Sequence, residues 1–213
     1  MRAGESPPVT LALPPQMLWD TLDSEATITT IETPFDDFHI KFAKSNHQLQ
    51  AANLLVEKMY LSRGYSIEHV LNNVHHGKTL VVETDGEVIG TMAICMDGKL
   101  GLPADENYRD KLDELRRRGR KLCEPSRLAI RRTLPHRVFA ALIHTSYLYS
   151  HKIHDCTDYI IEVNPRHAAF YKKILGFEEL GGLRTCKRVN APALLLSLEC
   201  VYIEEHLKKT HEQ

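Results

Sequence analysis

The sequence predicts a single α/β domain with a mixed β-sheet, and three observations support this prediction. Short apolar runs with strand-like alternation follow one another along the chain, separated by longer segments whose apolar residues recur at helical spacing. The hydrophobic content of 43% and the charged content of 26% are ordinary for a folded domain. The 213 residues contain no internal repeat and no low-complexity tract. We therefore expect one core, in a domain over residues 36–200, large enough for an enzyme.

The two ends of the chain differ from this domain. Pro7-Pro8 and Pro14-Pro15 interrupt any helix near the start, so residues 1–35 are expected to form a partly ordered N-terminal extension. Residues 201–213 are charged and follow the last apolar run, and we expect them to form a helical tail.

The domain is expected to begin with one strand and two helices. Residues Phe38–Phe42 alternate between apolar and polar, which is the pattern of a half-buried strand. Ser45 or Asn46 begins a helix, because either side chain can cap its first turn, and Gly64 ends it. A second short helix is expected near residues 67–71.

A hairpin and a charged helix come next. Thr79–Glu83 and Val88–Cys95 are apolar runs on either side of Asp85-Gly86, a dipeptide that favours a two-residue hairpin turn. Asp105–Arg118 is mostly charged, and we expect an exposed helix there. Cys123–Ile130 has the composition of a further strand.

Two more helices and the last strands complete the domain. Pro135–Ser150 has apolar residues at helical spacing after a proline suited to a first helical turn. Tyr159–Val163 is a short apolar run typical of a buried strand, and Arg166–Leu175 has helical spacing with a glycine directly after it. We expect a strand or turn at Phe177–Leu180 and a final strand at Ala193–Val201.

The charge balance and the cysteines restrict the class of protein. Lys and Arg number 27 against 28 Asp and Glu, so a basic nucleic-acid-binding protein is not expected. No apolar run approaches the roughly 18 residues of a membrane-spanning helix, and no secretory signal is recognisable. The five cysteines are scattered without a C-x-x-C pair, which is typical of reduced thiols. We expect a cytoplasmic protein without a transmembrane segment.

The strand Cys123–Ile130 carries a candidate catalytic residue. Pro125 removes one ladder hydrogen bond and predicts a bulge or an opened edge, where Glu124 could gain a raised pKa and act as a general base. A structural ion pair between glutamate and arginine is the alternative. Strict alternation would place Glu124, Ser126 and Leu128 on one face, and Pro125, Arg127 and Ala129 on the other.

The segment Asn164–Tyr171 joins a strand end to a helix start. Tyr171 lies far enough inside the helix to reach a group at the strand tip, where it could form a hydrogen bond with a leaving group. A half-buried packing role is the alternative for this tyrosine. His167 is expected to cap the helix or to be exposed.

Basic residues lie on both sides of the Glu124 strand. They could form one positive patch suited to phosphate or an acidic partner, or two separate solvated faces. Before the strand they are Arg116, Arg117, Arg118, Arg120 and Lys121, and after it Arg131, Arg132, His136 and Arg137.

Other chemistry has weaker support. Arg184–Ala193 is expected to be a polar loop that could close over a site, and Cys186 within it has either a lowered pKa or no chemical role. The histidines and cysteines form no metal-ligating motif, so no metal is expected. Neither a P-loop nor a G-x-G-x-x-G motif is present, so a nucleotide cofactor has no support.

The order of elements, together with the pattern Asn-x5-Phe-Tyr-x3-Leu-Gly-Phe at Asn164–Phe177, resembles the GNAT superfamily of N-acyltransferases. Three segments over residues 36–200 look like the long-chain N-acyl amino acid synthases (FeeM-like), namely Glu124–Ala129, Ile161–His167 and Arg188–Leu195. The Glu-x-Ser-Arg element is also similar to that of acyl-homoserine lactone synthases.

This resemblance implies a mixed, mostly antiparallel sheet with helices on both faces and two splayed central strands, Cys123–Ile130 and Tyr159–Val163. An acyl-phosphopantetheine arm would lie between them as the donor, with no cofactor bound permanently. Residues 130–137 lack the glycines with which most GNAT enzymes hold a diphosphate. Arg131, Arg132 and Arg137 instead suit the single phosphate of an acyl carrier protein, with coenzyme A as the alternative donor.

The resemblance also implies roles at the site. Glu124 would accept a proton from the amine of an amino acid, Tyr171 would contact the departing sulfur, and a backbone N–H near Leu128 or Ala129 would bind the carbonyl oxygen. Arg127 would support Glu124 or bind the acceptor's carboxylate, and alternation favours the first. Further contacts to the acyl-pantetheine are expected from Ser126, Arg127, Leu128, Ala129, Asn164 and Phe170.

Two other functions stay open at this stage. One is a GNAT enzyme that uses acyl-coenzyme A, or an acyl-homoserine-lactone-type synthase, acting on a different amine. The other is a binding module for acyl carrier protein without catalysis, which would need neither Glu124 nor Tyr171.

Overall fold

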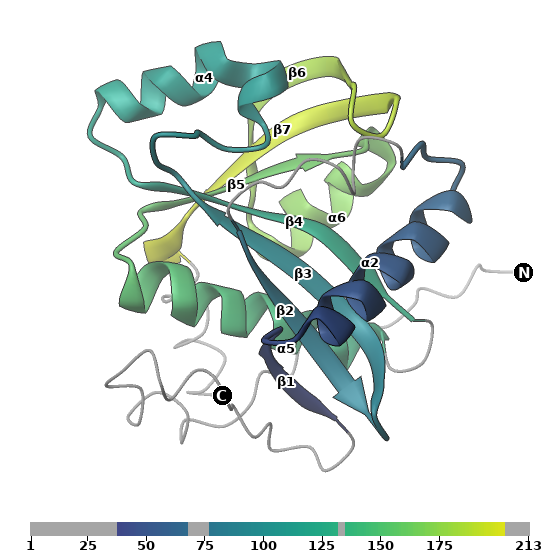
Figure 1. Cartoon of the computed structure of the whole chain (residues 1–213). Coiled ribbons are helices and arrows are strands. Elements are labelled where there is room, and N and C mark those ends of the chain that lie inside the picture. The colour runs from purple at the N-terminus through teal and green to yellow at the C-terminus, as the bar shows by residue number, and fades with distance from the viewer. Residues whose placement is uncertain (1–37, 68–76, 132–134, 203–213) are drawn as a thin grey trace, which may run out of the picture.

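A computed structural model describes residues 38–67, 77–131 and 135–202 of the chain. The expected N-terminal extension over residues 1–35, most of the expected tail over residues 201–213, most of the expected short helix near residues 67–71, and Arg132 lie outside this part. One sheet with the strand order β1-β2-β3-β4-β5-β7-β6 forms the centre of the molecule (Figure 1). All neighbours in it are antiparallel except β4 and β5. The mixed, mostly antiparallel sheet is therefore confirmed.

The elements have the following bounds. The strands are β1 (His39–Phe42), β2 (Lys78–Thr84), β3 (Glu87–Met96), β4 (Leu122–Ile130), β5 (Asp158–Val163), β6 (Glu178–Cys186) and β7 (Ala191–Glu199). The helices are α2 (Asn46–Leu61), α4 (Asp105–Arg117), α5 (Pro135–Tyr147), the π-helical turn η2 (Leu148–Ile153) and α6 (Pro165–Leu175). No helix in residues 38–67, 77–131 and 135–202 is long and apolar enough to cross a bilayer.

Helices cover both faces of the sheet. Helices α2 and α4 pack on one side, which we call the α2/α4 face, and α5 and α6 pack on the other, the α5/α6 face (Figure 1). Alternate residues of β3 show the division, because Ala93 and Cys95 face α2 and the α4 cluster whereas Ile94 joins the core under α5. The α5/α6 face holds the largest apolar cluster.

Local sequence signals explain several element ends. Asp85 and Gly86 adopt φ values of 50° and 78°, as a type I′ turn requires, and they join β2 to β3 as predicted. Ser45 and Gln48 form a capping box at the start of α2. Asn164 caps α6, and Gly176 ends it in the left-handed conformation.

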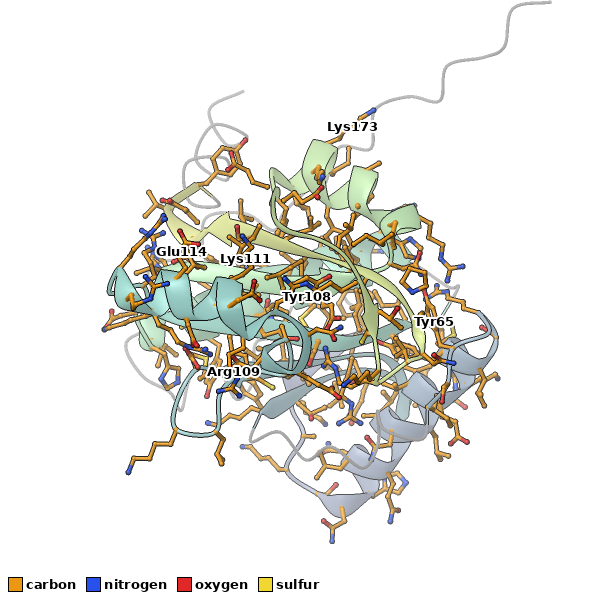
Figure 2. The ribbon with its side chains drawn as sticks, turned by 90° about the horizontal axis from the view of Figure 1, so that it is seen from above. Tyr65, Tyr108, Arg109, Lys111, Glu114 and Lys173 are labelled. Carbon is orange, nitrogen blue, oxygen red and sulfur yellow. The ribbon has the colours of Figure 1, made fainter. Side chains whose placement is uncertain are left out.

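Helix α4 is less exposed than its charge predicts. Tyr108 is fully buried, and its hydroxyl lies 2.8 Å from the carbonyl oxygen of Ala193 and 3.0 Å from that of Gly182. Figure 2 shows Tyr108 on the side of α4 that is nearest to β6 and β7, and the exposed Arg109 on the other side of the helix. One buried stripe is thus enough to dock α4 onto β6 and β7, even though most of its residues are charged.

Two expectations about the second half of the domain are wrong. Arg184–Ala193 is not a loop, since β6 continues to Cys186 and β7 begins at Ala191, so the segment is a hairpin with a tight turn. The helix expected to end at Ser150 gives way after Tyr147 to a π-helical turn. Neither feature has a marker as strong as Asp-Gly, which explains why composition alone missed both.

Strands β4 and β5 separate after a short shared start. Only Leu122↔Asp158 and Cys123↔Tyr159 are paired between them, and beyond these positions β4 follows β3 while β5 follows β7 (Figure 1). Pro125 lies just past the separation and has no N–H to donate. We call the unpaired part of these strands the β4–β5 opening. It confirms the expected pair of splayed central strands.

A bulge in β4 reverses the alternation that strict pairing would give. Ser126 pairs with Ala93 and Ala129 with Thr91, so Arg127 and Leu128 together oppose the single residue Met92. Arg127 has the left-handed φ of 53°, which is uncommon for a non-glycine residue.

The extra residue changes which side chains share a face. Arg127 contacts Asn53 of α2 and Ala129 packs in the α2 cluster, whereas Leu128 packs on the α5/α6 face. The expectation that Leu128 shares a face with Glu124, and that Arg127 and Ala129 lie opposite, is therefore wrong. Arg127 lies on the same face as Glu124.

Candidate active site

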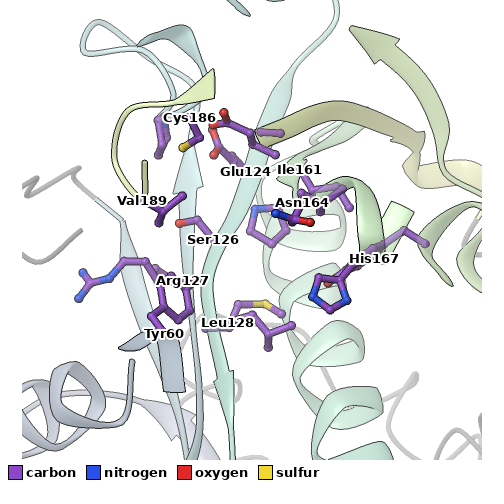
Figure 3. A pocket seen from close by; sticks show the side chains of 18 of the residues that line it. Tyr60, Glu124, Ser126, Arg127, Leu128, Ile161, Asn164, His167, Cys186 and Val189 are labelled. Atoms are coloured by element: carbon purple, nitrogen blue, oxygen red, sulfur yellow. The ribbon is translucent and has the colours of Figure 1, made fainter. Parts of the chain in front are cut away.

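A cavity of about 710 Å³ lies at the β4–β5 opening (Figure 3). Its lining includes residues of β4 and β5 and residues from both faces of the sheet. The cavity therefore passes through the opening and has one half on each face.

The two halves differ in chemistry. On the α2/α4 face the lining combines small apolar residues with most of the charged side chains of the cavity, and we call this the polar half; its polar residues include Tyr60, Arg63, Tyr65, Glu124, Ser126, Arg127, Glu162, Cys186 and Arg188. On the α5/α6 face the lining is mainly apolar and aromatic, with His136 and His167 as polar exceptions, and we call this the apolar half; its apolar and aromatic residues include Met92, Leu128, Phe139, Ile143, Tyr159, Ile161, Phe170, Tyr171 and Phe177.

Glu124 lines the polar half and is 1% exposed. The N–H of Ala104, at the start of α4, donates a hydrogen bond of 2.7 Å to its Oε2 atom. Burial raises the pKa of Glu124 to about 7, although Arg188 and the Ala104 hydrogen bond act in the opposite direction. A carboxyl group with this pKa exchanges a proton readily near neutral pH, as a general base must.

Arg188 connects Glu124 to a second buried carboxylate. Its Nη2 atom lies 3.8 Å from Oε1 of Glu124 and forms an ion pair with Glu162, which also accepts a hydrogen bond of 2.8 Å from Asn107. Arg188 begins the segment Arg188–Leu195, which resembles the FeeM-like synthases, but no role was predicted for it from the sequence. One feature of the sequence could have indicated such a role, because Arg188 is the one basic residue in this segment.

Tyr171 lines the apolar half, with its ring edge-on to Phe170 at 5.5 Å and to Phe177 at 5.8 Å. Burial raises the pKa of the Tyr171 phenol, so the group stays protonated at neutral pH and can donate a hydrogen bond. The structure thus brings Glu124 and Tyr171 to one cavity from opposite faces of the sheet. Their catalytic roles remain predictions.

The other residues expected to bind the acyl-pantetheine divide into two groups. Ser126, Arg127, Leu128, Asn164 and Phe170 all line the cavity, and Figure 3 shows the first four around the opening. Ala129 does not line it, because its side chain is 1% exposed within the α2 cluster. Of the two residues considered for a backbone N–H that binds the carbonyl oxygen, Leu128 is the one that lines the cavity.

The residues expected to bind a phosphate also separate. Arg131 lines the cavity just beyond the end of β4, together with His136, and forms a 2.5 Å ion pair with Glu87. Arg137 does not line the cavity, and its guanidinium lies 6.0 Å from the centre of the Phe38 ring. Arg132 lies outside the described residues. His167 is in the first turn of α6 and lines the cavity.

The basic residues on either side of β4 do not form one patch. They lie at opposite ends of a strand of nine residues, which is roughly 25 Å long. Arg116 bonds to Asp97, Asp105 and Asp113, and Arg120 pairs with Asp158. The group before the strand is thus largely neutralised within the protein.

The five cysteines are free and buried. Cys186 lines the polar half, but burial raises the pKa of its thiol, so the alternative of a lowered pKa is wrong. Among the described residues no group of histidine, cysteine and carboxylate side chains is arranged to hold a metal ion.

Comparisons with known proteins agree with this geometry. A family model described as N-acyl amino acid synthase FeeM matches residues 51–199. The solved structure of FeeM, an N-acyl amino acid synthase from uncultured soil microbes, is 28% identical, with a TM-score of 0.71 over 79% of this chain and 93% of that chain. No curated protein sequence has significant similarity to the chain.

More distant structures share the fold. An N-acetyltransferase from Staphylococcus aureus Mu50 is 12% identical, with a TM-score of 0.53 over 77% of this chain and 98% of that chain. The acyl-homoserine lactone synthase LasI is 14% identical, with a TM-score of 0.52 over 76% of this chain and 90% of that chain. The resemblance to GNAT enzymes predicted from the sequence is therefore confirmed. The chain is an N-acyltransferase with the GNAT fold, and it belongs to the N-acyl amino acid synthase FeeM family.

Proposed function

We propose that this protein transfers a long-chain fatty acyl group from a thioester on acyl carrier protein to the amine of an amino acid. The observation that carries the proposal is the cavity at the β4–β5 opening, with one polar half and one apolar half. A fatty acyl chain and a zwitterionic amino acid require such different surroundings, and the opening is where the two would meet.

The apolar half suits the acyl chain. Phe139, Ile143, Tyr159 and Ile161 supply apolar surface from α5 and β5, and burying each methylene group there is favourable by about 0.8 kcal/mol. The gain grows with chain length, so this half favours a long acyl group over an acetyl group.

The polar half supplies the base. In the reaction, the Glu124 carboxylate accepts a proton from the ammonium group, and the freed nitrogen attacks the thioester carbonyl carbon. A C–N bond forms and the C–S bond breaks, and the attacking nitrogen loses its second proton to solvent as the amide forms. The sulfur leaves as a thiol, and Glu124 returns its proton to solvent. Since the pKa of Glu124 is raised by burial to about 7, a large fraction of the enzyme holds the carboxylate at neutral pH.

Two further groups would stabilise the negative charge that develops on the carbonyl oxygen and on the departing sulfur. The carbonyl oxygen becomes negative as nitrogen attacks, and we assign its stabilisation to the backbone N–H of Leu128, a residue that lines the cavity. Tyr171 donates its phenolic proton to the departing sulfur, which leaves as a neutral thiol, and the phenol recovers a proton from solvent. Burial keeps the Tyr171 phenol protonated beforehand.

The residues just beyond the end of β4 indicate which thioester is the donor. Residues 130–137 contain no glycine, so they are poorly suited to wrap a diphosphate with backbone N–H groups. Arg131 and His136 instead line the cavity there with side-chain donors, which suits the one phosphate of a carrier-bound pantetheine arm.

The test is a reaction of the purified protein with an equimolar mixture of the proteinogenic amino acids. Palmitoyl-acyl carrier protein, palmitoyl-coenzyme A and acetyl-coenzyme A serve as separate donors, and mass spectrometry identifies the amides. We expect an N-palmitoyl amino acid, formed with the highest kcat/KM from the carrier protein, and little product from the Glu124→Gln variant. Acylation from acetyl-coenzyme A alone would contradict the long-chain assignment, and a preference for palmitoyl-coenzyme A would contradict the carrier protein.

A further inference from the structure

We propose that Arg127 binds the α-carboxylate of the amino-acid acceptor, so that it selects acceptors whose amine lies next to a carboxylate. The inference rests on the proposed function and deepens it. It assigns a binding residue and defines which amines the enzyme accepts.

The first observation is a cation without a carboxylate. One guanidinium nitrogen of Arg127 donates a hydrogen bond to Asn53, while its Nε atom is buried with no hydrogen-bond partner. Within residues 38–67, 77–131 and 135–202, no carboxylate lies within ion-pair distance of it. Arg116, Arg120, Arg184 and Arg188 each have such a partner.

Such an arrangement is unfavourable without a ligand. Arg127 is half-buried, and a charge that has lost part of its hydration is stabilised by a counter-charge and by hydrogen bonds to its buried nitrogen. In accordance with this, burial lowers the pKa of the Arg127 guanidinium. A carboxylate entering from solvent would supply both the charge and an acceptor for Nε, through the paired geometry that arginine favours.

The second observation is where the side chain lies. Arg127 lines the polar half of the cavity on the same face as Glu124, and Figure 3 shows its side chain beside Tyr60 with the guanidinium directed away from Glu124, on the side where it bonds to Asn53 of α2. Glu124 is three residues earlier on the same strand. The proposal requires the acceptor to lie between these two side chains, with its carboxylate toward Arg127 and its amine toward Glu124.

The third observation is the backbone at this position. Arg127 is held at a φ of 53° inside the bulge, a conformation that costs a non-glycine residue energy. With strict alternation the side chain would lie on the α5/α6 face, beside the apolar half. The bulge thus places a cation in the half of the cavity where the acceptor would bind, and alternation no longer favours the supporting role considered for it from the sequence.

The experiment competes the proteinogenic amino acids against their matching carboxamides, with palmitoyl-acyl carrier protein and palmitoyl-coenzyme A as donors. A carboxamide keeps the amine and the side chain but loses the negative charge. We expect the wild-type enzyme to favour the acids by roughly 10- to 100-fold, the range of a hydrogen bond between charged groups. Arg127→Gln should reduce this ratio to near one, and Arg127→Met, which keeps the apolar stem, should do the same.

Arg184→Gln is the matched control, since Arg184 lies outside the cavity and already pairs with a carboxylate, that of Asp110. It should keep the preference for acids. A wild-type ratio near one, or the wild-type ratio retained in either Arg127 variant, would overturn the role of Arg127 and leave the acyltransfer reaction intact. If the wild-type enzyme acylates neither acids nor carboxamides, the proposed function itself fails.

Discussion

Arg188 and Glu124 lie 3.8 Å apart inside the cavity, from Nη2 to Oε1, which is within ion-pair range but too far for a direct hydrogen bond. Arg188 is held at this distance by its closer ion pair with Glu162. Glu124 therefore receives part of the benefit of a neighbouring cation while burial keeps its pKa high, at about 7. This relationship sets the pH at which the proposed base is ionised.

Replacing Arg188 with glutamine should move the activity profile to higher pH. The cation lowers the pKa of Glu124, so its loss should raise the midpoint of kcat/KM against pH by about one pH unit. Arg184→Gln is the control, because Arg184 pairs with Asp110 and does not line the cavity. An unchanged or more acidic midpoint in Arg188→Gln would refute this coupling.

Glu124→Gln should lose activity without losing the fold. Glutamine keeps the size of the side chain but cannot accept the ammonium proton, so kcat should fall by about 10²- to 10⁴-fold. Circular dichroism and the melting temperature check that the variant is folded. Glu114→Gln, on the surface of α4, should retain wild-type turnover. Full turnover in Glu124→Gln would remove Glu124 as the base.

The same residue predicts how stability depends on pH. Its pKa is about 7 in the folded protein against an ordinary 4.5, so between these values the folded state binds more protons than the unfolded state. The contribution of the protonated Glu124 to the free energy of unfolding is therefore complete below pH 4.5, and it is lost as the pH rises through about 7. It should amount to on the order of 3 kcal/mol.

Urea unfolding at pH 4.5 and pH 8 measures this contribution. The free energy of unfolding of the wild-type protein should fall, relative to that of Glu124→Gln, as the pH rises between these limits. The comparison removes the effect of all other titrating groups that the two proteins share. Parallel pH profiles for the two proteins would show that Glu124 does not titrate as described.

Tyr171→Phe should affect the departure of the thiol. Phenylalanine keeps the contacts with Phe170 and Phe177 but has no proton to donate, so kcat should fall by about tenfold or more with little change in KM. A thioester of a more acidic thiol needs less help to leave, and the variant's deficit should shrink with such a donor. An equal deficit with both donors would indicate packing as the role of Tyr171.

Ile143→Trp should shorten the acyl group that the enzyme accepts. Ile143 projects from α5 into the apolar half, and the larger ring would occupy space that a long chain needs. The ratio of kcat/KM for octanoyl over palmitoyl donors should therefore increase. Ile174→Trp, at an exposed position of α6 outside the cavity, should leave the ratio unchanged. If both variants keep the wild-type ratio, the acyl chain does not lie along α5.

Sequence reasoning located most of the elements because their signals are local. The Asp85-Gly86 turn, the cap at Ser45 and the glycine after α6 each depend on a few neighbouring residues. The π-helical turn after α5 and the length of β6 depend on packing with distant strands, which periodicity does not record. The resemblance to GNAT enzymes supplied the splayed strands, which spacing alone did not.

The site was predicted less completely than the fold. Glu124 and Tyr171 were selected and do line one cavity. Arg188 was given no role because its importance comes from a contact between β4 and the β6–β7 hairpin, far apart in sequence. Pro125 indicated an irregular strand, but not that the extra residue would be Arg127, which decides the face of each later side chain.

Arg127 is the one residue in β4 that the ladder to β3 does not need. A chain with this residue deleted could pair Ser126, Leu128 and Ala129 with Ala93, Met92 and Thr91 in unbroken succession. Each remaining side chain would keep its present orientation, and the strained dihedral angle would disappear. The sheet would be more regular without the arginine, so strand pairing supplies no reason for the extra residue, whereas the carboxylate contact proposed above would supply one.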